Sequence, residues 1–178
     1  IIHIMSLELD DIYISQAEYY MQECFELAKN ALGRTSPNPI VGAIVLDKEG
    51  VPVGRGFHQK SGEDHAEVIA LKEAGEKARG GTLFVSLEPC CHFGKTPPCT
   101  DLIIKSGISQ VYFSNYDPNP LIDTCGEKKL SENNIKVFSR VLEEDGKELN
   151  KFFLKWIKTK HPWITLKQAQ TPDGKVSY

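Results

Sequence analysis

The chain has 178 residues, of which 40% are hydrophobic and 25% are charged, which is enough for one globular domain with a sizeable core. Its formal net charge of −3 and pI near 6.0 argue against a nucleic-acid-binding surface, which needs a stripe of basic residues. No apolar run approaches the roughly 18 residues of a membrane-spanning helix, so we expect neither a nucleic acid nor a membrane as partner.

The first residues and the cysteines bear on where the protein works. The segment Ile1–Met5 is too short for a signal peptide and lacks basic residues, and we expect residues 1–13 to be disordered or derived from an expression vector. An odd number of cysteines, three of them close together, suits a reducing compartment better than a disulfide framework. The cysteines are Cys24, Cys90, Cys91, Cys99 and Cys125. We therefore predict a cytoplasmic protein.

The first predicted elements are a helix and a hairpin. Apolar residues at helical spacing predict a helix over residues 14–32, which Ser15 can cap and Gly33 ends. Two apolar and β-branched segments, 40–47 and 51–58, predict strands. The short turn between them contains a glycine and joins the strands as an antiparallel hairpin.

The next two elements carry residues suited to chemistry. A helix is predicted over residues 65–79, with His65 and Glu67 in its first turn, where the helix dipole is positive. A short apolar strand over 82–87 leads to Cys90. Because α/β sheets place their chemistry at the carboxyl ends of strands, Cys90 is a candidate functional residue.

The rest of the chain alternates helices and strands. The remaining predicted elements are a helix over 100–105, a strand over 110–116, a helix over 123–133, a strand over 135–139, a helix over 141–159 and a strand beginning within 161–167. Strands joined by helical crossovers are parallel. The order of elements therefore predicts a five-stranded mixed sheet between helical layers, on which the apolar side of the last helix packs.

Two stiff loops each carry an asparagine between two prolines. Asn38 precedes the first strand of the hairpin, and Asn119 follows the strand over 110–116, two residues after Asp117. The prolines keep each asparagine out of a helix. From the residues alone, Asn38 is either a turn former or a ligand contact, and His58, at the end of the hairpin, is by default a surface histidine. Two such loops near one site suggest two walls of a single pocket.

A metal site is the strongest chemical signal in the sequence. One imidazole and two thiols, from His65, Cys90 and Cys99, are ligands of the kind that Zn²⁺ selects. Cys99 precedes a predicted helix, and a helix N-terminus lowers the pKa of a thiol. Three protein ligands leave the fourth tetrahedral position for water, as in a catalytic zinc site. Cys91 should point elsewhere if the backbone is extended, so we predict that it is not a ligand.

Glu67 stands two residues after His65, close enough to reach a water at the open position of the metal. Zinc lowers the pKa of such a water toward ~7. A carboxylate can then take its proton and deliver it to a leaving amine. A His-x-Glu and Pro-Cys-x-x-Cys signature is typical of zinc nucleobase deaminases. This chain differs in one respect, because eight residues separate Cys90 from Cys99.

The chain resembles the pyrimidine deaminase of riboflavin biosynthesis over about residues 20–178. The motifs that carry the resemblance are Ser36-Pro37-Asn38-Pro39-Ile40-Val41-Gly42, His65-Ala66-Glu67, Leu87-Glu88-Pro89-Cys90-Cys91-His92, Gly94-Lys95-Thr96-Pro97-Pro98-Cys99 and Asp117-Pro118-Asn119-Pro120. The resemblance implies an α/β fold, the cytidine-deaminase-like three-layer α/β/α sandwich. Cys125 lies in a turn that is glycine-rich in the family.

The resemblance also implies a reaction and a site. The reaction is the hydrolytic deamination of 2,5-diamino-6-ribosylamino-4(3H)-pyrimidinone 5′-phosphate to 5-amino-6-ribosylaminouracil 5′-phosphate. Glu67 would be catalytic, and His65, Cys90 and Cys99 would hold Zn²⁺. The residues implied to bind the small phosphorylated aminopyrimidine are Asn38, His58, Lys95, Thr96, Asp117 and Asn119.

The same resemblance divides the chain. Residues 14–160 correspond to the deaminase domain, and residues 161–178 resemble the start of the reductase domain that is fused to it in bifunctional members. The sequence contains no glycine-rich dinucleotide loop, so we expect neither binding nor oxidation of NADPH.

Two other functions stay open at this point. One is a zinc deaminase of another nucleotide or of a base in RNA, although editors of RNA and cytidine usually keep two residues between the cysteines. The other is a structural zinc module for interaction, which would need a fourth protein ligand. The sequence leaves the oligomeric state open, a homo-oligomer included.

Overall fold

The computed structural model describes residues 2–93, 97–118, 125–171 and 173–176, apart from the side chains of residues 2–15. One five-stranded sheet lies at its centre, with the strand order β2-β1-β3-β4-β5. The strands are β1 Gly42–Leu46, β2 Pro52–Phe57, β3 Thr82–Leu87, β4 Gln110–Asn115 and β5 Lys136–Phe138. Strand β1 pairs antiparallel with β2 and β3, whereas β3, β4 and β5 pair in parallel. The predicted five-stranded mixed sheet is therefore confirmed.

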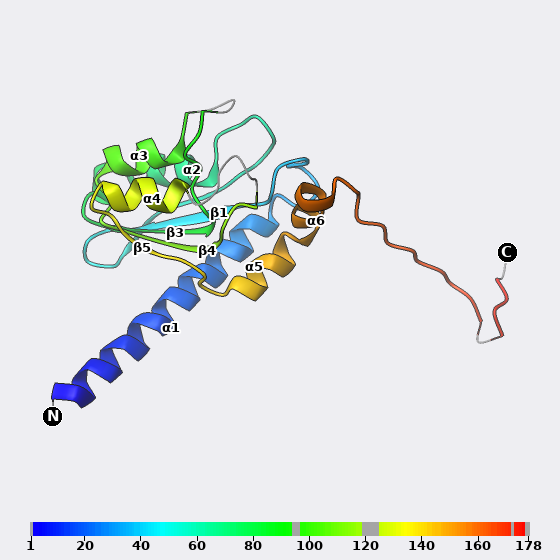
Figure 1. Cartoon of the computed structure of the whole chain (residues 1–178), viewed down its shortest axis with the longest axis horizontal. Coiled ribbons are helices and arrows are strands. Elements are labelled where there is room, and N and C mark those ends of the chain that lie inside the picture. Colours follow the sequence, from blue (N-terminus) through cyan, green and yellow to red (C-terminus); the bar gives the residue numbers. More distant parts are fainter. Residues whose placement is uncertain (1, 94–96, 119–124, 172, 177–178) are drawn as a thin grey trace.

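Helices cover both faces of the sheet (Figure 1). The helices are α1 Ile2–Lys29, α2 Ala66–Ala74, α3 Cys99–Ser106, α4 Cys125–Glu132, α5 Glu143–Leu149 and α6 Lys151–Thr159, and a short 3₁₀ helix, η1 Gly75–Ala78, continues α2. Helices α2, α3 and α4 lie on one face, and α1 and α5 lie on the other, which confirms the predicted three-layer α/β/α sandwich. None of the described helices is both long and apolar enough to cross a bilayer.

Alternating side chains of the central strand β1 supply both halves of the core. Ala43 and Val45 belong to the apolar cluster that includes α2, whereas Ile44 and Leu46 belong to the cluster under α1. Every residue of β1 is buried, because a central strand with helices on both faces has no solvent side.

Two glycines of β2 bring α2 close to the sheet. A Cβ atom at Gly54 would lie 2.1 Å from the Ala70 carbonyl oxygen, and one at Gly56 would lie 2.4 Å from the Ala66 carbonyl oxygen. Only glycine permits this approach of helix backbone to strand backbone. The contact fixes the amino end of α2, which carries His65 and Glu67.

The first helix differs from the prediction. Helix α1 begins at Ile2 and not near residue 14, so the expected helix start and the expected cap at Ser15 are both wrong. Figure 1 shows the amino-terminal half of α1 projecting away from the sheet. The expectation that residues 1–13 are disordered or derived from an expression vector stays a prediction.

The carboxyl-terminal segment also differs. The single helix predicted over 141–159 is two helices, α5 and α6, that meet at Asn150. The strand predicted within 161–167 is absent, and no residue among the described part of 160–176 lies in a helix or strand. This tail extends away from the body (Figure 1), so its backbone has no neighbouring strand with which to pair.

Candidate active site

His65, Cys90 and Cys99 converge at the carboxyl end of β3. His65 is the N-cap residue of α2, Cys90 follows β3, and Cys99 is the first residue of α3. His65 Nδ1 lies 3.6 Å from Cys90 Sγ and 3.3 Å from Cys99 Sγ. The backbone N–H of Cys99 donates to Cys90 Sγ at 3.3 Å. Residues 25 and 34 positions apart are thus in direct contact.

This geometry fits a zinc ion. Zinc–sulfur bonds of about 2.3 Å and zinc–nitrogen bonds of about 2.0–2.1 Å at tetrahedral angles separate the two ligand atoms by about 3.6 Å. Among the described residues, the group has three candidate ligand side chains, and their ligand atoms lie within 4.8 Å of one another. A structural zinc site has four protein ligands, so a three-residue group favours a catalytic site.

The three side chains of the triad shift one another's pKa values. The pKa of Cys90 is lowered to about 4 because the Cys99 thiol and the His65 ring hydrogen-bond to its sulfur. The same interaction raises the pKa of Cys99, which gives its proton to that bond. The hydrogen bond to Cys90 raises the pKa of His65 to about 9. These shifts favour the thiolate, which is the form of cysteine that binds metal, at Cys90, and a metal ion bound to all three residues would displace the protons of His65 and Cys99.

A cavity of about 460 Å³ opens beside the triad. Its lining comes from the loop before β1, the segment from β2 into α2, the end of β3, the end of β4, and α6. The lining residues are Pro37, Asn38, Pro39, Val41, His58, Ser61, Gly62, Glu63, His65, Glu67, Leu87, Glu88, Cys90, His92, Asp117, Phe153, Trp156 and Ile157. The triad thus has one side that a small molecule can reach.

Glu67 combines burial with a place in this lining. Its side chain is 4% exposed, and burial raises the pKa of its carboxyl. It lies in the first turn of α2, directly after the His65 cap. A buried carboxyl with a raised pKa next to a metal-binding group is suited to proton transfer.

Asn38 and His58 form a hydrogen-bonded pair in the pocket wall. His58 is 2% exposed, so the default expectation of a surface histidine is wrong. Its Nδ1 lies 3.1 Å from the Asp64 carbonyl oxygen, which can only accept, so Nδ1 carries the proton. Nε2 then accepts a hydrogen bond from Asn38 Nδ2 at 3.1 Å. Burial lowers the pKa of His58, which keeps the ring neutral.

The other residues implied to bind substrate have different outcomes. Asp117 lies in the cavity lining, after the carboxyl end of β4. Lys95, Thr96 and Asn119 lie outside the described residues.

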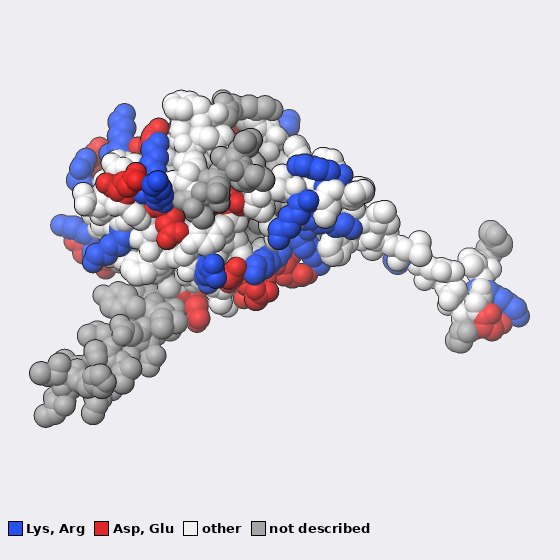
Figure 2. Space-filling view, viewed as in Figure 1, with Lys and Arg blue, Asp and Glu red and all other residues white. Residues whose placement is uncertain are grey.

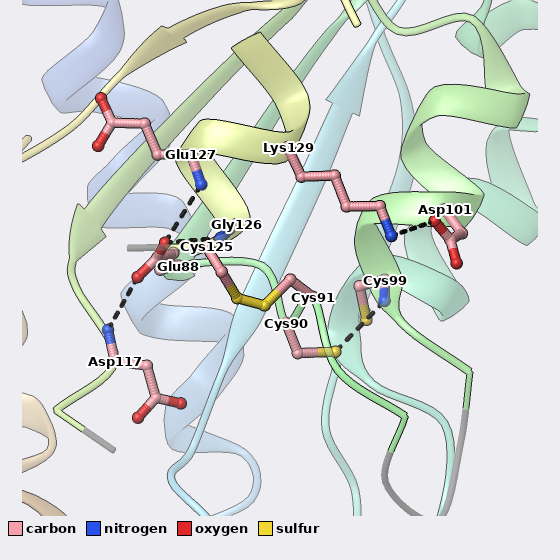
Figure 3. The surroundings of a disulfide bond; sticks show 10 residues. All are labelled: Glu88, Cys90, Cys91, Cys99, Asp101, Asp117, Cys125, Gly126, Glu127 and Lys129. Atoms are coloured by element: carbon pink, nitrogen blue, oxygen red, sulfur yellow. Dashed lines mark hydrogen bonds and ion pairs between the residues drawn. A yellow bond between two sulfur atoms is a disulfide. The ribbon is translucent and has the colours of Figure 1, made fainter. Parts of the chain in front are cut away.

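Glu88 is a buried residue to which the sequence assigned no role. Its side chain is 4% exposed, and its carboxylate accepts backbone hydrogen bonds from Asp117 at 3.4 Å, Gly126 at 3.0 Å and Glu127 at 3.2 Å (Figure 3). Burial raises its pKa, and these three donors oppose the rise. Glu88 therefore ties the end of β3 to the loop after β4 and to the amino end of α4. The signal in the sequence that could have identified Glu88 is its position directly before Pro89-Cys90.

A disulfide joins Cys91 to Cys125, with Cα atoms 5.9 Å apart. The cysteine count did not suggest this pair. Figure 3 shows the Cys91 sulfur turned to Cys125 at the start of α4, while the Cys90 sulfur faces Cys99. The structure therefore agrees with the prediction that Cys91 is not a metal ligand.

Helix α6 forms a wall of the cavity that sequence reasoning missed. Phe153, Trp156 and Ile157 line the cavity, although the repeat of apolar residues had predicted packing on the core. No residue of α6 is fully buried, and Phe152 and Trp156 are 52% and 40% exposed. Helical periodicity identifies an apolar face, but it does not say whether that face meets a core or a cavity.

Comparisons with known proteins agree with this geometry. Residues 14–115 match the family model of the cytidine and deoxycytidylate deaminase zinc-binding region. The chain is 54% identical to the riboflavin biosynthesis protein RibD of Aquifex aeolicus over 158 residues, which are 89% of this chain and 44% of that protein. It is 48% identical to the diaminohydroxyphosphoribosylamino-pyrimidine deaminase of Buchnera aphidicola, over 81% of this chain and 97% of that protein.

A solved structure is similar as well. The diaminohydroxyphosphoribosylaminopyrimidine deaminase/5-amino-6-(5-phosphoribosylamino)uracil reductase of Thermotoga maritima superposes with a TM-score of 0.86 at 47% identity, over 92% of this chain and 47% of that one. The chain thus spans a little under half the length of the RibD proteins that it matches.

Proposed function

The chain belongs to the cytidine and deoxycytidylate deaminase family, among the diaminohydroxyphosphoribosylaminopyrimidine deaminases, and on that premise we propose that it deaminates an aminopyrimidine nucleotide. The proposed substrate is 2,5-diamino-6-ribosylamino-4(3H)-pyrimidinone 5′-phosphate, which water converts to 5-amino-6-ribosylaminouracil 5′-phosphate and ammonia. The observation that carries the proposal is the His65-Cys90-Cys99 group, of which His65 and Cys90 line one cavity together with the buried Glu67.

Zinc is the proposed cofactor, held by His65, Cys90 and Cys99. When bound there, it would supply Lewis-acid chemistry that makes a water molecule acidic near neutral pH. The ligand separations and the lowered pKa of Cys90 support this choice. Soft thiolate ligands together with imidazole also favour zinc over magnesium or calcium.

Glu67 is the proposed proton carrier. Its carboxylate takes a proton from the attacking water and passes it to the ring nitrogen of the substrate. It then delivers the second proton to the departing amine, so that ammonia leaves and a carbonyl forms. A single buried carboxyl can serve both transfers because its raised pKa lets it hold a proton between the two steps.

The walls of the cavity supply groups for orientation. The neutral His58 ring uses both of its nitrogens in the bonds to Asp64 and Asn38, and so holds the Asn38 amide in place. The amide oxygen and the second amide N–H of Asn38 are then aimed at ring and ribose atoms of the substrate. We propose that Asp117 has the same role, and Lys95, Thr96 and Asn119 stay predictions. Helix α6 carries lysines and no acidic residue, and Figure 2 shows basic side chains gathered around it. A basic surface beside the cavity suits a phosphorylated ligand.

Several broader assignments stay proposals. We propose that residues 14–160 are the deaminase unit and that residues 161–178 correspond to the start of a second domain. We propose a cytoplasmic site of action because Cys24, Cys90 and Cys99 are free thiols, and the Cys91–Cys125 disulfide counts against it. A homo-oligomer stays a prediction.

A turnover assay tests the function. The zinc-loaded protein is offered the proposed substrate, cytidine 5′-monophosphate and deoxycytidine 5′-monophosphate, and ammonia release is measured. We expect release from the diaminopyrimidinone nucleotide at a much higher kcat/KM than from the other two. Preference for a cytosine nucleotide would support the competing deaminase, and release from none would favour the structural zinc module.

A further inference from the structure

Helix α6 packs on the rest of the protein through half-buried side chains, among them Phe153, Leu154 and Ile157. It contributes Phe153, Trp156 and Ile157 to the cavity, yet none of its residues is fully buried. A helix with so little buried surface needs another contact to keep one position. That contact lies at Asn150, the residue between α5 and α6.

The Asn150 side chain binds both backbone groups of Ile40. Its Nδ2 donates to the Ile40 carbonyl oxygen at 3.0 Å, and its Oδ1 accepts the Ile40 N–H at 3.0 Å. The side chain is 5% exposed. The side-chain amide thus makes the two backbone hydrogen bonds that a neighbouring strand would make, and it joins positions that are 110 residues apart in the sequence.

Both ends of this clamp lead into the cavity. Ile40 comes two residues after Asn38, which is hydrogen-bonded to His58. Asn150 directly precedes α6, whose first turn contains Phe153. A displacement of Asn150 would therefore move the aromatic wall relative to the Asn38–His58 pair.

The amino end of α5 is hydrogen-bonded to the carboxyl end of β4. The Asn115 amide donates to the Glu143 carbonyl oxygen at 2.9 Å, and Ser114 Oγ donates to the Leu142 carbonyl oxygen at 3.1 Å. A Cβ atom at Gly146 would lie 2.0 Å from Asn115 Oδ1, so α5 fits closely against the end of β4. With α5 fixed, the freedom of α6 depends on Asn150.

We propose that Asn150 is a positioning residue for the deamination, and that Phe153 and Trp156 contact the substrate across the cavity from Asn38 and His58. The proposal rests on the proposed function of the same site. It adds an aromatic wall for the pyrimidine nucleotide and a side chain that sets the distance between the two walls. Aromatic side chains favour planar, partly apolar ligands such as nucleobases.

Kinetics of two variants test the clamp. Asn150→Ala removes both bonds to Ile40, and a misplacement near 1 Å at a reactive site costs about 10²-fold in kcat/KM. We expect the loss mostly in KM, with zinc content unchanged. The matched control is Ser109→Ala, because Ser109 Oγ lies 2.9 Å from the Gly80 and Gly81 carbonyl oxygens at the opposite, amino ends of β3 and β4. The control should keep its KM within about twofold of the parent value, since no wall of the cavity moves.

The fluorescence of Trp156 reports directly on the aromatic wall that α6 contributes to the cavity. The chain has two tryptophans, so Trp163→Phe leaves Trp156 as the single indole, and Glu67→Gln prevents turnover. Titration of this double variant with the diaminopyrimidinone nucleotide should change Trp156 fluorescence saturably. Adding Asn150→Ala should weaken that binding by about tenfold or more.

The truncation Trp156→Ala decides the matter if Asn150→Ala fails to fold, because a side chain that is 40% exposed can be shortened without loss of the core. It should raise KM roughly tenfold with little change in kcat, from the loss of an aromatic contact. If the parent is active and the KM of both variants differs from its KM by less than twofold, this inference is overturned and the proposed function stays intact. A parent that releases no ammonia would overturn the function, and the fluorescence titration would still decide whether α6 contacts the nucleotide.

Discussion

Glu67→Gln separates proton transfer from metal binding. The amide keeps the size of the side chain and part of its hydrogen bonding, but it cannot accept a proton from water. Glu67 is buried in the first turn of α2 and is not a member of the three-residue metal group. The variant should therefore keep its zinc, its fold and its affinity for substrate while losing turnover.

The size of the loss follows from the number of proton transfers. General acid–base catalysis contributes about 10²–10⁴-fold, or roughly 3–5 kcal/mol of activation free energy. In the proposed reaction, Glu67 serves both the attack of water and the departure of ammonia. We therefore expect a fall in the single-turnover rate at or above the upper end of that range.

The assay has a control outside the cavity. Glu76 is exposed and lies in η1, which continues α2 away from the site. Glu76→Gln makes the same chemical change and should leave the rate within about threefold of the parent, because it removes only a screened surface charge. Single-turnover deamination, zinc content and ligand titration are measured on both variants.

Two results would refute the reasoning. A Glu67→Gln rate within tenfold of the parent would mean that another group carries the protons, and His58 and His92 of the same lining are the next candidates. Loss of zinc from the variant would mean that Glu67 supports the metal group, and its assignment as proton carrier would be wrong.

Three further predictions concern the metal, the buried carboxylate and the pocket histidine. Cys90→Ala or Cys99→Ala should abolish zinc binding, whereas Cys91→Ala should retain about one zinc per chain by metal analysis; zinc loss only in the last would reverse the assignment. Glu88→Ala leaves three backbone donors without their carboxylate, and should lower the free energy of unfolding in urea by roughly 2–4 kcal/mol; a change below about 0.5 kcal/mol would contradict it. Burial lowers the pKa of His58 in the folded chain. As the pH falls, the imidazole of the unfolded chain is therefore protonated before that of the folded chain, and the free energy of unfolding should fall below about pH 6.5. His58→Gln should flatten that dependence, and an unchanged slope would exclude His58 as its source.

The sequence by itself predicted the sheet and the candidate metal ligands. Apolar and β-branched segments predicted the five strands, and apolar residues at helical spacing predicted most helices, because these patterns depend on which residues face a core. The spacing of His65, Cys90 and Cys99 pointed to one group, because each lies at a predicted element end on the same edge of the sheet. Such local patterns can be read without knowledge of the tertiary structure.

The tertiary structure alone decided how the pocket is built. The hydrogen bonds from Asn38 to His58 and from Asn150 to Ile40 join residues 20 and 110 positions apart, and no local pattern encodes such a pairing. The apolar face of α6 gave the same periodicity whether it met a core or a cavity. The predicted strand after α6 failed for a related reason, because a strand exists only where another backbone accepts its hydrogen bonds.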